Sequence, residues 1–125
     1  MLEALNILET EETPAILLDQ QSGNLKFSGR SIPENADFFY STIINWILQY
    51  FKEPNTFTQI EMKFEYFNSA SAKNIMEILV LFDKFYKDGN NIKITWFYEH
   101  NDDIMQEKGL DIIEVLNLPV EVKTC

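Results

Sequence analysis

The sequence lacks most features that secreted, membrane and phosphate-loop proteins require. Its single cysteine, Cys125, excludes an internal disulfide framework and fits a reducing compartment. Its four glycines are scattered and form no Gly-rich phosphate loop. The longest apolar run, Ile78–Phe82, is far too short to cross a bilayer. Residues 1–25 contain five acidic side chains and no Lys or Arg, so no secretory signal is expected. We therefore predict a cytoplasmic protein.

Basic side chains are also scarce. Ten Lys and Arg residues face 20 Asp and Glu residues, which gives a net charge of −10. A chain without a basic patch cannot release counterions from phosphates, so nucleic acid and anionic membranes are not expected partners. The chain is nevertheless 46% hydrophobic and 14% aromatic, which is typical of a globular protein. Its 125 residues, without a linker or repeat, predict a single domain spanning 1–125.

No set of residues suited to catalysis can be assembled. His100 is the only histidine, and Cys125 ends the sequence, so a Cys–His pair is not expected. Glu99, His100, Asp102 and Asp103 have the side chains of metal ligands but match no metal-ligand spacing. They read better as an acidic helix start, where the helix dipole favours carboxylates. The sequence therefore predicts a protein that is not an enzyme and holds no metal or cofactor.

Hydrophobic periodicity predicts alternating strands and helices. The expected strands are Ala15–Asp19, Leu25–Ser28, Phe57–Phe67, Asn91–Tyr98 and Leu118–Val122. The expected helices run from a capping box at Ser31–Glu34 to about Lys52, from about Ser71 to Asp88, and from about Asp102 to Leu116. The first two strands form an antiparallel hairpin, and strand–helix–strand connections predict parallel neighbours.

Alternation along the strands predicts how the layers are arranged. Ile60, Met62, Phe64 and Tyr66 are expected on one face, and the wet face is expected to carry Gln59, Glu61, Lys63, Glu65, Lys93 and Thr95. Strands covered on both sides would be apolar throughout. We therefore predict a two-layer α/β fold, with a mixed sheet of about five strands and helices mainly on one face. Phe97 falls on the wet face, either as part of a contact surface or beneath a loop or terminus.

The junction between the longest strand and the second helix is the strongest candidate site. Residues Phe64–Lys73 pass from one pattern to the other without Gly or Pro, and Asn68, Ser69 and Ser71 lie at the change. A helix N-terminus exposes unpaired N–H groups and partial positive charge, which suits a phosphate. Asn68 or Ser69 can equally serve only as the helix cap.

Several motifs in order give the chain a recognisable layout. They are Thr13-Pro14 before Leu17-Leu18-Asp19, Phe27–Asn35 before Phe39-Tyr40, Tyr66–Lys73, Trp96–Asp103, Gly109 and Leu118-Pro119. On these motifs the sequence resembles the SiaC family of bacterial regulatory phosphoproteins, which are built like STAS-type anti-anti-sigma factors. The resemblance covers nearly the full length and implies a STAS-like fold, in agreement with the layers predicted above.

The resemblance also implies a phosphorylation site. In the family, residues 68–73 usually read Asn-Thr-Ser-Ser-Ser-Lys, and the first hydroxyl residue is phosphorylated. Here that residue is Ser69, with Asn68 and Lys73 in its surroundings. Alanines replace two of the family serines, so Ser71 is the only competing acceptor and the second choice.

The implied function is that of a signalling switch. By resemblance, a serine/threonine kinase of the anti-sigma-factor ATPase type would phosphorylate the chain, and a PPM-type phosphatase would reverse the reaction. The unphosphorylated form would bind and activate a diguanylate cyclase, raising cyclic di-GMP and promoting aggregation or biofilm growth. Two alternatives remain at this point: a STAS-like sensor domain that binds a small molecule or nucleotide, and an interaction module that is never phosphorylated.

Overall fold

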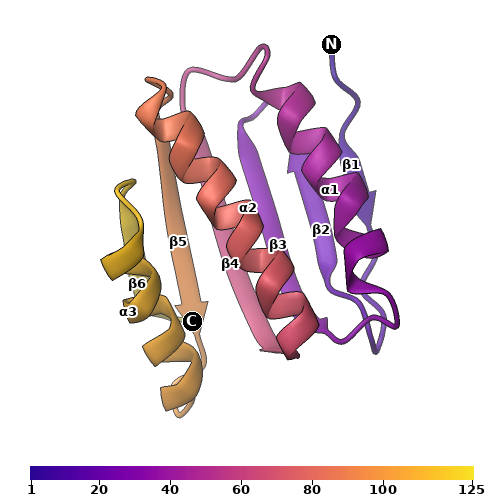
Figure 1. The fold of residues 1–125 in the computed structure, drawn as a ribbon, viewed down its shortest axis with the longest axis vertical. Helices are drawn as coiled ribbons and strands as arrows, with labels where there is room; N and C mark the ends of the chain where they lie inside the picture. The colour runs from indigo at the N-terminus through magenta and orange to yellow at the C-terminus, as the bar shows by residue number, and fades with distance from the viewer.

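Six strands form one mixed sheet, and three helices cover one of its faces (Figure 1). The computed structural model describes all residues from 1 to 125. The strands are β1 Leu5–Ile7, β2 Ala15–Asp19, β3 Asn24–Ser31, β4 Thr58–Phe67, β5 Ile92–Tyr98 and β6 Val120–Thr124. The helices are α1 Ala36–Tyr50, α2 Ser69–Lys87 and α3 Asp103–Val115. None of these helices has both the length and the apolar character needed to cross a membrane.

The strand order explains why all three helices share a face. The strands lie in sequence order across the sheet, with β1–β2 and β2–β3 antiparallel and the later pairs parallel. Parallel crossovers are almost always right-handed. Three successive right-handed crossovers that advance in one direction place α1, α2 and α3 on the same side (Figure 1). The predicted two-layer arrangement is therefore confirmed.

The hydrophobic core lies between the sheet and the helices. It contains 25 buried residues, to which every strand from β2 to β5 contributes alternate side chains. From the helices, α1 contributes Tyr40, Ile43 and Ile47, and α2 contributes Leu79 and Phe82, all fully buried. A core of this size fixes where each helix begins relative to the sheet edge, which positions the site described below.

The uncovered face of the sheet is polar, as predicted. Ion pairs cross it between Lys26 and Glu61, at 3.8 Å, and between Lys93 and Glu121, at 3.1 Å. The prediction that Thr95 is exposed to solvent is wrong, because Thr95 is buried although it lies on this face. The amide Nε2 of Gln59 donates to Thr95 Oγ1 at 3.1 Å and covers the hydroxyl.

Phe97 on the same face is half-buried rather than freely exposed. The Lys123 ammonium of β6 lies 5.8 Å from its ring centroid. Cys125 N donates to Tyr98 O at 3.1 Å, which holds the chain end beside this part of β5. The structure thus favours the expectation that a terminus shields Phe97.

The sheet has one strand more than predicted. The additional strand, β1, consists of three residues that pair with Ile16–Leu18 of β2. So short a segment has too few alternating positions to be recognised by periodicity. It lies at one edge of the sheet, beside β2.

The start of the first helix was predicted too early. Ser31 does not open a capping box; it is the last residue of β3 and is fully buried. The helix begins at Ala36, and Asn35 is its N-cap, with Oδ1 accepting from Phe38 N at 3.1 Å. Pro33 disfavours helical backbone in the residue before it, so the helix starts beyond it.

The predicted inward position of Tyr66 is also wrong. Gly29 of β3 pairs with Phe64 of β4, but the next β3 residue, Arg30, pairs with Tyr66. The extra residue in β4 is a β-bulge, which reverses the alternation beyond it. Phe67 consequently packs on the core side, 5.5 Å from the ring of Phe64, while Tyr66 is 49% exposed.

Candidate functional site

The junction between β4 and α2 is capped by Asn68. This residue has extended backbone angles, and its Oδ1 accepts from Ser71 N at 2.9 Å. Asn68 N also donates to Ser31 O at 3.1 Å, which ties the cap to the end of β3. The helix starts at Ser69, two residues earlier than predicted. The N-cap of α2 is therefore Asn68, as one of the two predictions had it, and the Ser69 hydroxyl does not cap the helix.

Ser69 is the first residue of a 19-residue helix, and its side chain is exposed. The N–H groups of a first helical turn have no partners within the helix, and Asn68 satisfies only that of Ser71. The first turn of α2 contains no acidic residue that would oppose an added anion. A phosphoryl group on Ser69 would therefore meet free donors and the positive end of the helix dipole.

Ser71 lies only two residues away but is enclosed. Its side chain is 0% exposed, and its Oγ accepts from Ser31 Oγ at 2.8 Å. Ser31 Oγ also lies 2.6 Å from Tyr40 Oη of α1. A protein kinase could not reach the Ser71 hydroxyl without opening the first turn of α2. Of the two predicted acceptors, only Ser69 is accessible.

Burial raises the pKa of Tyr40 to about 12, although the nearby hydroxyls of Ser31 and Ser71 lower it in part. The phenol therefore stays protonated over the whole physiological range. The three hydroxyls together form a neutral hydrogen-bonded chain with no contact with water.

Lys73 lies one helical turn beyond Ser69 and is exposed. Residues four apart on a helix are neighbours, so its ammonium can approach a group on Ser69. The next residue, Asn74, is buried, and its Nδ2 donates to Asp37 Oδ1 of α1 and to Ala70 O, each at 3.0 Å. The start of α2 is thus linked to α1 directly through Asn74 and indirectly through Ser31 of β3.

Sequence reasoning found Asn68, Ser69, Ser71 and Lys73, but it missed the residues that surround them. Ser31 and Tyr40 reach the junction from β3 and α1, far away in the sequence. A buried hydroxyl and a buried tyrosine have no local pattern that distinguishes them from ordinary core residues. The tertiary packing of α1 and the end of β3 against α2 brings them together.

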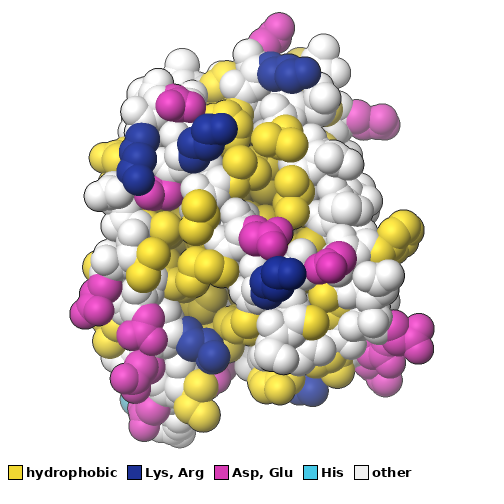
Figure 2. Space-filling view, viewed as in Figure 1, with side chains coloured by type: hydrophobic (Ala, Val, Ile, Leu, Met, Phe, Trp, Pro, Cys, Tyr) yellow, Lys and Arg dark blue, Asp and Glu magenta, His cyan; other side chains and the backbone are white.

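An apolar groove of about 190 Å³ runs between α2 and α3 and begins one turn from Ser69. Apolar side chains gather there in the space-filling view (Figure 2). Its lining includes Phe67, Ala72, Met76, Trp96 and Ile112. This groove offers a binding partner apolar surface beside the candidate site.

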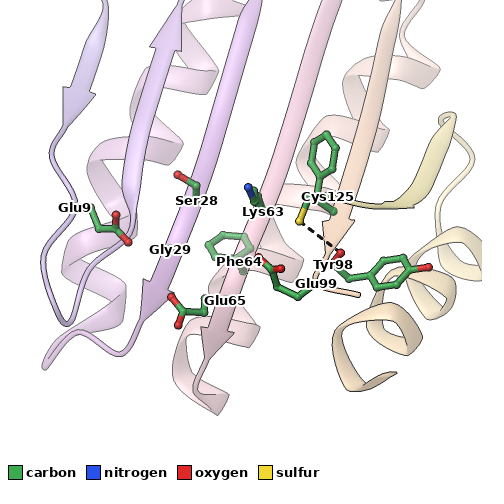
Figure 3. A pocket seen from close by; sticks show the side chains of 10 residues that line it. Glu9, Ser28, Gly29, Lys63, Phe64, Glu65, Tyr98, Glu99 and Cys125 are labelled. Atoms are coloured by element: carbon green, nitrogen blue, oxygen red, sulfur yellow. Dashed lines mark hydrogen bonds between the residues drawn. The ribbon is translucent and has the colours of Figure 1, made fainter. Parts of the chain in front are cut away.

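A larger hollow, of about 450 Å³, lies on the uncovered face of the sheet (Figure 3). Its polar lining includes Lys63 and three carboxylates, Glu9, Glu65 and Glu99, which come from separate segments (Figure 3). No three acidic, histidine or cysteine side chains of the chain are grouped so that they could hold a metal ion. Its carboxylates distinguish this hollow from the junction, where the buried hydroxyls are neutral.

Known proteins resemble this chain over nearly its whole length. The family model described as SiaC family regulatory phosphoprotein matches residues 7–125. An uncharacterised protein of Pseudomonas aeruginosa strain UCBPP-PA14 is 27% identical over 119 residues, covering 95% of this chain and 94% of the relative.

Solved structures agree over the same length. One is the crystal structure of the P. aeruginosa diguanylate cyclase SiaD in complex with its activator SiaC, which matches with a TM-score of 0.91 and 26% identity, covering 97% of this chain and 99% of the matched chain. A structure of P. aeruginosa SiaC gives a TM-score of 0.90 at 26% identity and covers 99% of this chain and 100% of that chain. These matches confirm the STAS-like fold and the prediction of a regulatory protein rather than an enzyme. The chain belongs to the SiaC family of regulatory phosphoproteins.

Proposed function

We propose that this chain is a signalling switch that is reversibly phosphorylated on Ser69. The observation that carries the proposal is the contrast at the start of α2, where Ser69 is exposed and Ser71 is completely buried. Membership of a phosphoprotein family supports a hydroxyl acceptor. The helix N-terminus and Lys73 would stabilise the phosphorylated form.

The unphosphorylated form binds and activates a diguanylate cyclase and so raises cyclic di-GMP in the cytoplasm. This part rests on the likeness to SiaC, which is named as the activator of the cyclase SiaD. The phosphate comes from a serine/threonine kinase of the anti-sigma-factor ATPase type, and a PPM-type phosphatase removes it. Both enzymes need an acceptor that projects from the surface, as Ser69 does.

Physically, the switch is a change of charge at one point of a partner surface. Phosphorylation adds about −1.5 to −2 charges and three acceptor oxygens. A partner fitted to the neutral Ser69 hydroxyl and to the nearby apolar groove would then have to desolvate the phosphate. Binding is lost because the interface would bury an anion without matched donors.

The acceptor can be identified by mass spectrometry. The chain is incubated with the cognate kinase and ATP, and its intact mass and phosphopeptides are determined. We expect one phosphate on the wild-type chain and on Ser71→Ala, and none on Ser69→Ala. Ser41→Ala, which alters an exposed serine of α1, is the control for nonspecific phosphorylation. Phosphate retained by Ser69→Ala would contradict the assignment.

The partner can be tested by cyclase assays. Purified diguanylate cyclase from the same organism is titrated with unphosphorylated chain, with phosphorylated chain and with Ser69→Ala. We expect cyclic di-GMP synthesis to rise with the first and third and to stay near its basal rate with the second. A cyclase that responds equally to all three would show that phosphorylation of Ser69 does not control activation.

The hollow on the uncovered face gives the sensor alternative a specific location. Its volume lies within the range of small-molecule sites, but three carboxylates around it oppose anionic nucleotides. As a sensor, the chain would bind a neutral or cationic ligand with an affinity unchanged by Ser69→Ala. Protein purified from its native host would carry no phosphate, either as a sensor or as a purely structural module.

A further inference from the structure

The hydroxyl chain beneath Ser69 has a defined direction. Ser31 Oγ donates to Ser71 Oγ at 2.8 Å. A serine hydroxyl has one proton, so Ser31 cannot also donate to Tyr40. The bond of 2.6 Å between Tyr40 Oη and Ser31 Oγ is therefore donated by the phenol. Hydrogen bonds run in one direction from α1, through the end of β3, to the first turn of α2.

No member of this chain of hydroxyls can exchange its partner for water. Tyr40, Ser31 and Ser71 are each 0% exposed. In a buried site, a hydroxyl that loses its partner is left unsatisfied, which costs more than the loss of an exposed hydrogen bond. Helix ends usually fray, but this buried network opposes fraying at the turn that carries Ser69.

A second contact reaches the same turn from α1. Asn74 Nδ2 donates to Asp37 Oδ1 and to Ala70 O, each at 3.0 Å. The backbone of Ala70, which directly follows Ser69, is thereby linked to the first turn of α1. Two independent connections from one helix converge on a turn whose only exposed hydroxyl is the candidate acceptor.

We propose that Tyr40 and Ser31 are positioning residues: they fix the first turn of α2 and so hold the Ser69 hydroxyl in the orientation that is phosphorylated. The second half of this inference rests on the proposed function. Phosphoryl transfer needs the acceptor oxygen in line with the leaving group, so its rate depends on how well that oxygen is held. Neither residue touches the phosphoryl donor.

Tyr40→Phe removes the donor at the start of the hydroxyl chain and retains the ring. The matched control is Tyr50→Phe, on the same helix. Tyr50 lies at the opposite end of α1 from Ser69 and is also 0% exposed. Its Oη forms a buried bond of 2.7 Å with Thr58 Oγ1 of β4 and accepts from Asn55 N at 3.1 Å. A role confined to general stability predicts similar effects for the two variants.

The first measurement needs no kinase. Amide hydrogen exchange, followed by mass spectrometry, is compared for peptides that cover residues 68–74 under conditions in which both variants are fully folded. We expect faster exchange in Tyr40→Phe than in wild type, and wild-type exchange in Tyr50→Phe. Ser31→Ala should behave like Tyr40→Phe, and the double variant should add little, because the two residues belong to one network.

The second measurement is the rate of phosphorylation of Ser69 by the cognate kinase. We expect kcat to fall roughly tenfold in Tyr40→Phe, with little change in KM, and to be unchanged in Tyr50→Phe. Equal exchange at residues 68–74 in the two variants would overturn the inference, whatever the kinase does. Equal rates of phosphorylation would overturn its second half. Absence of phosphate on wild-type Ser69 would instead disprove the proposed function, while exchange would still decide whether Tyr40 fixes the turn.

Discussion

The buried carboxylate of Asp83, in α2, accepts a hydrogen bond of 2.9 Å from the backbone N–H of Leu118, in the loop between α3 and β6. The same oxygen accepts from Asn117 N at 2.8 Å, and the Lys87 ammonium lies 3.3 Å from the other oxygen. Burial raises the pKa of Asp83, but the two N–H groups and Lys87 outweigh it, so the pKa lies below its usual value. The last helix and strand are therefore tethered to α2 through a charged group.

This tether makes stability depend on pH. Because the Asp83 pKa is lower in the folded chain, the carboxylate stabilises the fold above its unfolded pKa of about 3.8. That contribution is lost as the pH falls through the lower, folded pKa. In urea titrations we expect the stability advantage of wild type over Asp83→Asn to be constant at neutral pH and to shrink below about pH 5. An advantage that is independent of pH would contradict this role.

Regular strands and helices were predictable because each has several periodic positions. In β5, the pattern of Ile92, Ile94 and Trp96 was enough to place one face in the core, and the structure buries all three. Local patterns fail where a partner decides the outcome. The bulge in β4 depends on its register against Gly29 and Arg30, and it turned Tyr66 outwards. Thr95 is buried on the polar face, where Gln59 of the neighbouring strand donates to its hydroxyl.

The candidate site was predictable only in part, for the same reason. Asn68 and Ser69 lie at a visible change of periodicity, so the junction could be located from the sequence. The burial of Ser71 against Ser31 could not, because it depends on how α2 is rotated against the sheet. The sequence around Ser31 is typical of a helix cap, but the structure places Ser31 at the end of β3, where it bonds to Tyr40 and Ser71.

Gly109 of α3 permits close packing on Trp96. A Cβ at this position would lie 2.5 Å from Trp96 Cδ1 and 3.0 Å from a methyl group of Val122. Alanine favours helix by about 1 kcal/mol over glycine, but overpacking a buried ring costs about 1–3 kcal/mol. We expect Gly109→Ala to lower the free energy of unfolding, measured in urea, by about 1 kcal/mol. Glu107→Ala, at an exposed position of the same helix, should change it by less than about 0.5 kcal/mol. A stabilised Gly109→Ala would show that α3 can move off the ring.

The two faces of the sheet should differ sharply in their tolerance to substitution. Ile94 is 0% exposed in the core, so Ile94→Ala should cost about 2–5 kcal/mol by opening a cavity. Glu61 forms a solvent-exposed ion pair with Lys26, so Glu61→Gln should change stability by less than about 0.5 kcal/mol. Denaturant midpoints of the two variants provide the comparison. Similar costs would mean that the polar face is covered in solution.

Phosphorylation of Ser69 should change binding and leave folding nearly unaltered. The phosphate would meet unpaired N–H groups and the positive end of α2, an interaction worth about 0.3–1 kcal/mol. Lys73 can add a weak, screened attraction, and repulsion from distant carboxylates is muted beyond about 8–10 Å. The phosphorylated chain should therefore melt within a few degrees of the unmodified chain.

The affinity of the phosphorylated chain for the activated partner should nevertheless fall at least about tenfold, or about 1.4 kcal/mol. Ser69→Asp should reproduce this only weakly, because aspartate has one charge and fewer acceptor oxygens than a phosphate. Titrations of both purified forms against the partner, with parallel thermal melts, measure the two effects separately. Equal affinities would exclude Ser69 as the switch, and a phosphorylated chain that unfolds would show that the phosphate acts on the fold instead of on the interface.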